Sequence, residues 1–459
     1  HGSPAAPMLL SIGAMIIREI AFRSPLDAFA PLAQEPVACL LHAGEKAAQP
    51  GWSIIAAFPT VRIECRRGGV FLDGRRSDRP PFDVLAAVHQ MRRRAEPADL
   101  PAPFHTGLVG FAGYELGAAL EPTAEGPASP FLLPDGAFGA YDASALFDRV
   151  ARRAFVVARS EREARRLEDA LGFEGAHGDA SFSFEPARSN FTREGYGRAV
   201  AEVIELIRGG AVFQANLSHQ IVAGSAEPVA PYCIFARLAA GAAPFGAYLA
   251  HERGAILSAS PERFFSVTRE QDGWRVCAEP IKGTRARSAD PVQDARLADE
   301  LRESPKERAE NIMIADLTRN DLSVVCADGS IREEEICALV STPEVHHLVS
   351  RICGRLRPGL SAIDALRALF PCGSVTGAPK VEAMKTIAAI EGRGRGPYCG
   401  AIGYLDDRGN ADFSVAIRLL IAERRDGGTK VTAPVGACRW PGGGFIPGYP
   451  HYLLLLLFC

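Results

Sequence analysis

The chain has 459 residues, a hydrophobic fraction of 47%, a charged fraction of 23% and a net charge of −3, with a pI of about 6.4. These values are typical of a globular protein with a substantial core, in one large domain or a few ordinary ones. The near-neutral charge excludes a strongly basic nucleic-acid-binding protein and gives no reason to expect binding to an acidic membrane surface.

The 11 cysteines are scattered and include no CxxC pair. We therefore expect neither a disulfide framework nor a zinc site, and we expect a reducing, cytoplasmic compartment. Residues 1–7 look like the remnant of an expression tag, and the apolar stretch 8–17 lacks the basic leader and the cleavage site of a signal peptide. No apolar run approaches the roughly 20 residues of a membrane span, so no membrane partner is expected.

The first half of the chain reads as short strands with a few helices. Strands are predicted at 37–41, 52–58 and 61–65 and, as a pair, over 141–158, and helices over 81–95 and 160–171. A glycine-rich strand at 103–111 turns into a short helix, and its glycines indicate close backbone packing. The polar connector 175–190 is the best internal boundary, and it divides the chain into parts 8–175 and 190–437.

The second half begins with an amphipathic helix predicted over 192–208, which is followed by a strand over 212–218. Another predicted strand, 255–260, ends two residues before Glu262. A carboxylate just past a strand end suits general acid or base chemistry. A surface ion pair with Arg263 explains this residue equally well at this stage.

The segment Pro280–Arg285, with the sequence PIKGTR, lies between a strand-like run at 274–280 and a charged helix at 290–304. Its Lys282 is a candidate for a buried amine, because burial disfavours the ammonium form, lowers the pKa and leaves a nucleophile near pH 7. An exposed lysine in a strand-to-helix turn is the alternative for so short a motif.

Glu307 and Glu310 lie three residues apart on a predicted helix, so they share one face. If that face points inward, the two carboxylates form half of a Mg²⁺ site, since Mg²⁺ is bound by one or two carboxylates plus water and substrate oxygens. An outward-facing, solvated pair is the alternative.

Three later segments carry further candidate side chains. Of the adjacent His346 and His347 in a strand, only one can face the interior. The turn 373–377 enters a helix and presents N–H groups to an anion, although it lacks Walker A spacing. Arg418 lies in an apolar strand, 413–420, that forms a hairpin with 398–405, and it needs an anionic partner: a substrate carboxylate or a structural salt bridge.

Six motifs in order, PIKGTR, KERAEN with DLTRND, VHHLVS, GSVTGAPK, GPYCGAIGY and FSVAIR, resemble those of the chorismate-utilising enzymes over residues 190–436. GWS at 51–53 and PFHTGLVGFAGYELG at 103–117 extend the resemblance, more weakly, into the first half. The resemblance implies an α+β fold in which two large β-sheets pack face to face, with helices on the outside and the active site between the sheets.

Two positions indicate the branch of the family. Lys282 is typical of the branch that converts chorismate and ammonia to 4-amino-4-deoxychorismate, whereas the anthranilate-forming branch, the nearest alternative, typically has a small residue there. Gln214 stands where isochorismate- and salicylate-forming members carry a lysine that activates water, and a glutamine cannot act as that base. After the Leu40–Leu41 pair, His42 replaces the acidic residue typical of members controlled by tryptophan, which argues against such feedback.

The resemblance also implies roles for individual residues. Lys282 would attack ring C2, Glu262 would act as acid and base, and His347 rather than His346 would orient or protonate the leaving hydroxyl. Tyr398 and Arg418 would hold the side-chain carboxylate of the substrate. The full set of implied substrate-binding residues is Gly283, Thr284, Gly373, Ser374, Tyr398, Arg418 and Gly436.

The implied cofactor is Mg²⁺, bound by Glu307 and Glu310. The implied partners are chorismate and a glutamine amidotransferase subunit, since no cysteine–histidine glutaminase segment is visible in this chain.

The last part of the chain departs from the family pattern. Family members end with an acidic helix whose two glutamates complete the Mg²⁺ site, but residues 438–459 include no Asp or Glu. This tail reads as an altered reading frame, a cloning artefact or a natural variant, and we expect it to pack badly. With two carboxylates in place of four, we expect weak Mg²⁺ binding and poor turnover, and an inactive scaffold for the amidotransferase is a further alternative.

Overall fold

The computed structural model describes residues 15–44, 51–94, 102–177, 182–425 and 427–439. The predictions for residues 1–7 and for the tail beyond residue 439 lie outside these ranges. Within them, no helix is long and apolar enough to cross a membrane.

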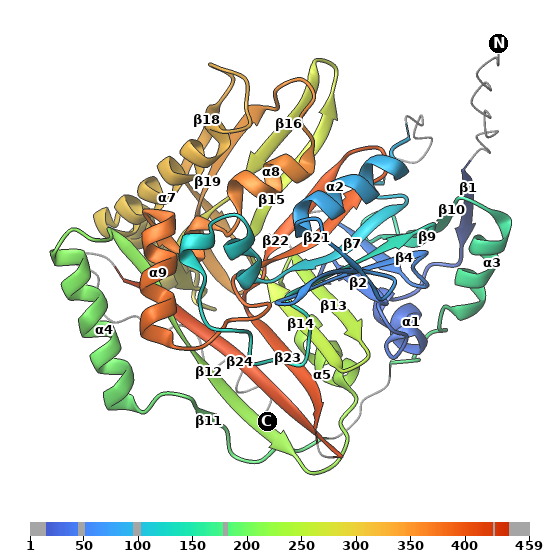
Figure 1. Ribbon diagram of the computed structural model, residues 1–459, viewed down its shortest axis with the longest axis horizontal. Coiled ribbons are helices and arrows are strands. Elements are labelled where there is room, and N and C mark those ends of the chain that lie inside the picture. The colour runs from blue at the N-terminus through green and yellow to red at the C-terminus, as the bar shows by residue number, and fades with distance from the viewer. Residues whose placement is uncertain (1–14, 45–50, 95–101, 178–181, 426, 440–459) are drawn as a thin grey trace.

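Two large antiparallel sheets form the centre of the molecule (Figure 1). In spatial order, the first sheet contains β1 (Ile16–Ile20), β10 (Arg153–Ala158), β9 (Ala143–Asp148), β3 (Trp52–Ala56), β2 (Cys39–His42), β13 (Phe245–His251), β14 (Gly254–Ser260), β23 (Leu419–Arg425), β24 (Gly428–Arg439), β12 (Gln214–Ser225) and β11 (Arg188–Ser189), and β20 (Gly377–Ala378) also pairs with β12.

The second sheet has the same number of described strands. In spatial order it contains β17 (Ile281–Ala286), β19 (Val345–Arg355), β16 (Gly273–Ala278), β15 (Arg263–Glu270), β22 (Ala411–Val415), β21 (Ala401–Asp406), β7 (Gly107–Ala112), β8 (Gly136–Tyr141), β4 (Val61–Arg66), β5 (Gly69–Leu72) and β6 (Arg75–Ser77), and β18 (Arg332–Ser341) also pairs with β19. Both sheets combine strands from before and after the connector, since β2 pairs with β13 and β7 pairs with β21.

Helices cover the outer faces of the two sheets (Figure 1). The helices α1 (Pro25–Phe29), α3 (Glu161–Ala170) and α5 (Pro231–Ala239) pack on the first sheet, with α4 (Arg193–Arg208) and α9 (Lys380–Glu391) against its β12 end. The helices α2 (Pro81–Arg92), α6 (Pro291–Glu303) and α7 (Pro305–Ser323) pack on the second sheet, and α8 (Ala362–Leu369) packs against α2 and α7. Short 3₁₀ turns complete the set: η1 (Ala30–Leu32), η2 (Tyr114–Ala119), η3 (Pro122–Ala124) and η4 (Gly373–Val375).

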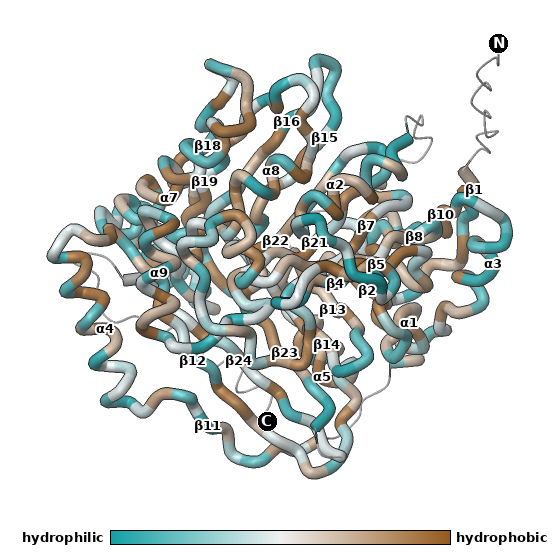
Figure 2. The backbone as a smooth tube through the Cα atoms, in the orientation of Figure 1, coloured by the Kyte–Doolittle hydropathy of each residue, from teal (hydrophilic) through white to brown (hydrophobic). Residues whose placement is uncertain are grey.

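The main apolar core lies between the sheets. Ile256 and Ile421 of the first sheet belong to the same buried cluster as Phe265 and Phe413 of the second, whose rings stack with centroids 5.3 Å apart. Apolar residues concentrate along the central strands, and polar residues along loops and outer helix faces (Figure 2). The predicted α+β fold, with two sheets face to face and helices outside, is therefore confirmed.

Local capping explains where the helices nearest the candidate site begin. The Ser304 side chain accepts a hydrogen bond from the backbone N–H of Glu307, and Pro305 occupies the first turn of α7. In α8, Ser361 and Asp364 form a reciprocal capping box. The Ser304 cap and Pro305 determine the residue at which α7 begins, ahead of Glu307 and Glu310.

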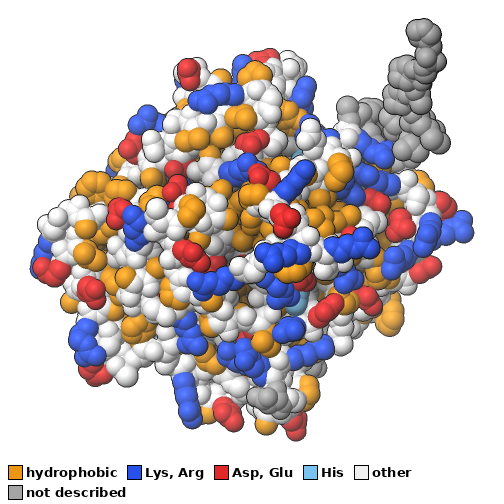
Figure 3. All heavy atoms as spheres, viewed as in Figure 1, with side chains coloured by type: hydrophobic (Ala, Val, Ile, Leu, Met, Phe, Trp, Pro, Cys, Tyr) orange, Lys and Arg blue, Asp and Glu red, His pale blue; other side chains and the backbone are white. Residues whose placement is uncertain are grey.

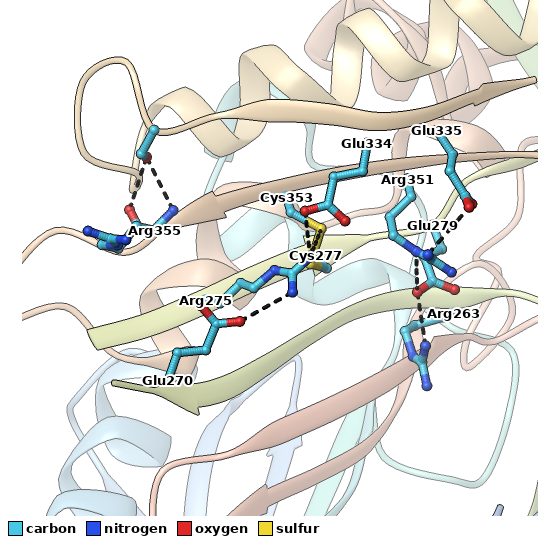
Figure 4. Close-up of a disulfide and its surroundings, with 11 residues drawn as sticks. Arg263, Glu270, Arg275, Cys277, Glu279, Glu334, Glu335, Arg351, Cys353 and Arg355 are labelled. Atoms are coloured by element: carbon cyan, nitrogen blue, oxygen red, sulfur yellow. Dashed lines mark hydrogen bonds and ion pairs between the residues drawn. A yellow bond between two sulfur atoms is a disulfide. The ribbon is translucent and has the colours of Figure 1, made fainter. Parts of the chain in front are cut away.

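One cysteine pair departs from the expectation of no disulfide framework. Cys277 of β16 and Cys353 of β19 are directly opposite in the ladder, with Cα atoms 4.1 Å apart, and their sulfur atoms are bonded (Figure 4). Their separation of 76 residues gives no sign of this pairing, because strand register is a tertiary property. Seven other cysteines in the described ranges are free.

Candidate active site

Two crossovers between the sheets place Glu262 and Arg418 side by side. The chain passes from β14 to β15 through Pro261 and Glu262, and from β22 to β23 through residues 416–418. The backbone N–H of Val415 donates to the Glu262 carbonyl (3.1 Å), and that of Ala259 donates to the Arg418 carbonyl (3.0 Å). The two crossovers are therefore hydrogen-bonded neighbours at the boundary between the sheets.

The predicted single strand over 413–420 is wrong at this point. It ends at Val415 and restarts at Leu419 in the other sheet, and Arg418 between them has a φ of 49°. A left-handed backbone at a non-glycine residue ends a strand and redirects the chain. The arginine thus lies at a corner between two layers.

Lys282 lies within a strand, β17, and not in the strand-to-helix turn of the alternative interpretation. Pairing of β17 with β19 is irregular between Ile281 and Thr284, and Gly283 in this bulge has a φ of 87°. A Cβ on Gly283 would lie only 3.0 Å from Leu301 Cδ1. Glycine is therefore required here both by its backbone conformation and by the close approach of α6.

The Lys282 side chain is largely enclosed, with 11% of its surface exposed. Its Nζ donates to the carbonyl oxygen of Ser374 (2.7 Å) and lies 3.5 Å from Glu310 Oε1. The exposed lysine of the alternative interpretation is therefore not found.

Glu262 is buried between the same groups. Its Oε1 accepts hydrogen bonds from Ser374 Oγ (2.8 Å) and from the backbone N–H of Ile281 (3.3 Å). Burial raises the pKa of this carboxyl group, and the nearby Lys282 and the Ser374 hydrogen bond act in the opposite direction. The alternative of an ion pair with Arg263 is not found, since that arginine pairs with Asp412 and Glu279.

His347 faces the site across the β17–β19 ladder. Its Nδ1 lies 2.9 Å from Thr284 Oγ1. Burial, assisted by the charge of Arg418, lowers the pKa of this imidazole to about 4, so the ring is neutral at pH 7. His346 contacts Ser341 and Asp294 of α6 instead, so the two adjacent rings lie on opposite faces of the strand. Both are buried, because α6 covers the second face, and the prediction that only one faces the interior is wrong.

Gly373 and Ser374 lie in η4, and β20 separates them from α9. The prediction that their turn leads directly into a helix is therefore wrong, and the positive end of α9 does not explain their position. A Cβ on Gly373 would lie 2.5 Å from Leu317 Cδ2, so η4 packs tightly on α7. The anion that Ser374 contacts in this structure is the carboxylate of Glu262.

Tyr398 and Gly436 form a second group. A Cβ on Gly436 would lie 2.8 Å from the Tyr398 hydroxyl and 2.7 Å from Asn216 Oδ1. Burial raises the pKa of Tyr398 well above its ordinary value, so the phenol is un-ionised at neutral pH. Arg395, which donates to the carbonyls of Asn216 and Val375, connects this group to the η4 turn beside Ser374.

Glu307 and Glu310 do share an inward face of α7. Glu307 lies 3.5 Å from an Arg285 guanidinium nitrogen, and Glu310 lies 3.5 Å from Lys282. In the ranges described, no group of three or more His, Cys, Asp or Glu side chains converges as metal ligands. Each of the two carboxylates is thus paired with a cation in this structure.

Sequence reasoning missed Asn311, which holds the two strands of the site together. Its Nδ2 donates to the Leu348 carbonyl of β19 (2.9 Å) and lies 3.4 Å from the Lys282 carbonyl of β17. Its Oδ1 accepts a hydrogen bond from Ser350 Oγ. The signal was its position one turn after Glu307, on the same inward face of α7.

Two hollows lie away from these residues. A groove of about 650 Å³ is lined by η2, β5 and α9, and a cavity of about 230 Å³ is lined by His42, Trp52 and Phe245. Neither is lined by Lys282, Glu262 or His347. On the face in Figure 3, Lys and Arg side chains are interspersed with Asp and Glu, which agrees with the small net charge.

Comparison with known proteins gives consistent matches. The profile of the chorismate binding enzyme family matches residues 38–437. Aminodeoxychorismate synthase component 1 of Klebsiella aerogenes is 38% identical over 401 residues, 86% of this chain and 87% of that protein. Anthranilate synthase component 1 of Thermus thermophilus is 34% identical over 414 residues, 87% of each chain. The crystal structure of anthranilate synthase component I from Streptococcus pneumoniae superposes with a TM-score of 0.75 at 28% identity, covering 85% of this chain and 88% of that one.

Proposed function

The chain belongs to the chorismate-binding enzyme family, as its motifs predicted, and from that premise we propose that it is the aminating component of an aminodeoxychorismate synthase. The reaction joins chorismate and ammonia to give 4-amino-4-deoxychorismate and water, the precursor step to p-aminobenzoate and folate.

The observation that carries the proposal is the position of the Lys282 amine. It is largely enclosed, and its Ser374 partner also donates to Glu262, so a nucleophile and a proton donor converge on one turn. The relatives named aminodeoxychorismate synthase and anthranilate synthase have similar identities, so identity alone does not separate the two activities. The proposal therefore rests on Lys282 as the nucleophile.

The proposed mechanism has two displacements. In the first, the neutral Lys282 amine forms a bond to ring C2, the double bond shifts, and the C4 hydroxyl leaves as water with a proton from Glu262. In the second, ammonia forms a bond to C4, the double bond returns, and the C2–N bond breaks to release the lysine. The proton lost by the new C4 ammonium group returns to Glu262. Two easier steps replace one direct substitution.

The electrostatics of the site favour this division of roles. Burial raises the pKa of the Glu262 carboxyl group, and this direction favours its assigned role as proton donor. An imidazole with a pKa of about 4 is a poor acid at pH 7, so His347 orients the leaving hydroxyl through a hydrogen bond. Arg418, whose charge acts on both groups, would hold the side-chain carboxylate together with Tyr398.

Glu307 and Glu310 would hold Mg²⁺, which when bound neutralises the ring carboxylate of the substrate. Because residues 438–459 contain no further carboxylate, we expect this binding to be weak. Calorimetric titration with Mg²⁺ measures it, and a micromolar or tighter dissociation constant would contradict the expectation. Ammonia would come from a separate glutamine amidotransferase subunit in the cytoplasm, in keeping with the name component 1 carried by the relatives.

The test is incubation of the purified chain with chorismate, ammonium and Mg²⁺, with and without an added aminodeoxychorismate lyase. The proposal predicts p-aminobenzoate only when the lyase is present. Fluorescent anthranilate without the lyase would instead support the anthranilate synthase alternative. If chorismate binds but no product forms, the result would support the scaffold alternative. In that case the only effect of the chain should be to stimulate the glutaminase activity of the amidotransferase subunit.

A further inference from the structure

The inner face of β12 carries a row of polar side chains. Because side chains alternate along a strand, Gln214, Asn216, Ser218 and Gln220 lie on one face, and all four are buried, with 0% to 7% of their surface exposed. Ala215 on the opposite face packs with Val203 and Ile207 of α4. The polar row therefore faces the interior, away from α4.

The two ends of this row differ in how their polar atoms are satisfied. Ser218 Oγ donates to Glu391 Oε1 (3.0 Å), and Gln220 Nε2 donates to the Gly394 carbonyl (3.0 Å). By contrast, both carboxamide atoms of Gln214 and the Oδ1 of Asn216 are buried without a hydrogen-bond partner among the residues described. Such groups are costly in a folded protein and are rarely retained without a reason.

The unsatisfied end of the row lies at the candidate site. The backbone of Gln214 pairs with Ala378, and the Asn216 N–H donates to the Thr376 carbonyl (2.9 Å), both in the segment that follows Ser374. The Asn216 carboxamide and the Tyr398 hydroxyl border the gap left by the missing side chain of Gly436. The unpaired amides thus adjoin the two segments that would hold the substrate.

We propose that Asn216 is a further substrate-binding residue, which recognises a carboxylate of a cyclohexadiene dicarboxylate through its side-chain amide. With its amide rotated so that Nδ2 occupies the present position of Oδ1, Asn216 donates to the side-chain carboxylate beside Tyr398. The oxygen and nitrogen of a side-chain amide exchange places when the group rotates by half a turn, so either atom of Asn216 can face the ligand. This inference rests on the proposed function.

The experiment measures chorismate binding by calorimetry and the thermal midpoint of the free chain for three variants. For Asn216→Ala we expect about 10-fold weaker binding, because one charge-assisted hydrogen bond is lost. For Asn216→Asp, which adds a negative charge next to a dianion, we expect roughly 50-fold weaker binding. Neither change removes a described hydrogen bond of the side-chain oxygen, so the midpoint of Asn216→Ala should stay the same or rise by about 1–2 °C.

Gln220→Ala is the matched control, since it truncates a buried amide on the same face whose hydrogen bond is satisfied within the protein. It should lower the midpoint by about 2–4 °C and leave chorismate affinity unchanged. The inference is overturned if Asn216→Ala lowers the midpoint as much as Gln220→Ala and binds chorismate as tightly as the unaltered chain. If the unaltered chain binds no chorismate, the proposed function itself fails. If the unaltered chain binds chorismate and Asn216→Ala binds it equally well, only the inference about Asn216 fails.

Discussion

The apolar cluster between the first sheet and its helices α1 and α5, here called the outer core, and the region around the two crossovers are both buried. They differ in the kinds of side chain that they contain. In the outer core, Phe29 packs its ring against Tyr232 and Tyr248, with centroids 5.5 and 5.6 Å away. The two phenols donate to backbone carbonyls, so their polar ends are satisfied. Such packing stabilises the fold and leaves nothing exposed for chemistry.

The crossover region combines features that cost stability. A largely enclosed amine, a buried carboxyl group with a raised pKa, a neutral histidine and a left-handed arginine converge there. The difference teaches that burial serves packing in one region and the tuning of polar groups in the other. Substitutions in the outer core should therefore lower the stability of the fold, and substitutions in the crossover region should lower the activity.

The largest expected effect is on the activity side of this comparison. Lys282→Ala should lower the rate of aminodeoxychorismate formation by about 1000-fold or more, because it removes the proposed nucleophile. Turnover with ammonium is the measurement. Lys385→Ala, which truncates an exposed lysine paired with Glu382, is the control and should retain full activity. Equal rates for both variants would refute the covalent role.

The next effect lies in the outer core. Phe29→Ala should lower the free energy of unfolding by roughly 3–5 kcal/mol, because it leaves a cavity among packed rings. Turnover per folded molecule should stay within about 2-fold, since the ring lies far from the chemistry in the fold. Denaturant unfolding and active-site titration measure the two quantities. Phe173→Ala, at a side chain that is 74% exposed, should change neither.

A smaller effect is expected at Asn311, a buried residue whose hydrogen bonds serve both the stability of the fold and the position of Lys282. Asn311→Ala should lower kcat by roughly 10- to 30-fold with KM changed less than about 3-fold, because the β17 bulge that carries Lys282 loses a hydrogen-bond donor. Asn311→Asp keeps the shape and the acceptor but loses the donor, so it should fall in the same range. Asn320→Ala near the exposed end of α7 is the control. A stability loss without any change in kcat would mean that Asn311 is structural only.

The smallest effect is a pH dependence shared by the two regions. The folded-state pKa of His347 is lowered to about 4, below the ordinary 6.5, so its contribution to stability is complete above about pH 6.5 and is lost as the pH falls toward 4. His42 is lowered to about 4 by burial in the first sheet and acts in the same direction. Replacing either by Asn should reduce the loss of unfolding free energy between pH 7 and pH 4.5 by about 1–3 kcal/mol.

Activity should distinguish these two histidines. His347→Asn should lower kcat, whereas His42→Asn should leave it unchanged. An unchanged pH dependence in both variants would mean that other groups control acid unfolding.

Much of this arrangement was predictable from periodicity and motif order. The helix over 192–208, the strand starting near Gln214 and the helix face shared by Glu307 and Glu310 all follow from local patterns. The shared site of Lys282, Glu262 and His347 was predictable only through the family resemblance, because the three come from different strands and a crossover.

Other features depend on tertiary structure and escaped prediction. A run of apolar residues around Arg418 looks continuous, yet the chain changes sheets there, and no local propensity encodes that change. The strand position of Lys282 depends on a bulge opposite β19, and the role of Asn311 depends on that bulge freeing a carbonyl group. The bond between Cys277 and Cys353 likewise requires knowledge of the register.

That bond encloses a particular stretch of the chain. Residues 277–353 form a covalent ring that contains Lys282, Thr284, Glu307, Glu310, Asn311 and His347. A protease that cuts once in an exposed loop of the ring, such as the turn near Gly329, would produce two fragments that remain joined by the disulfide. The nicked enzyme would then migrate as one band in a denaturing gel without thiols and as two bands after reduction.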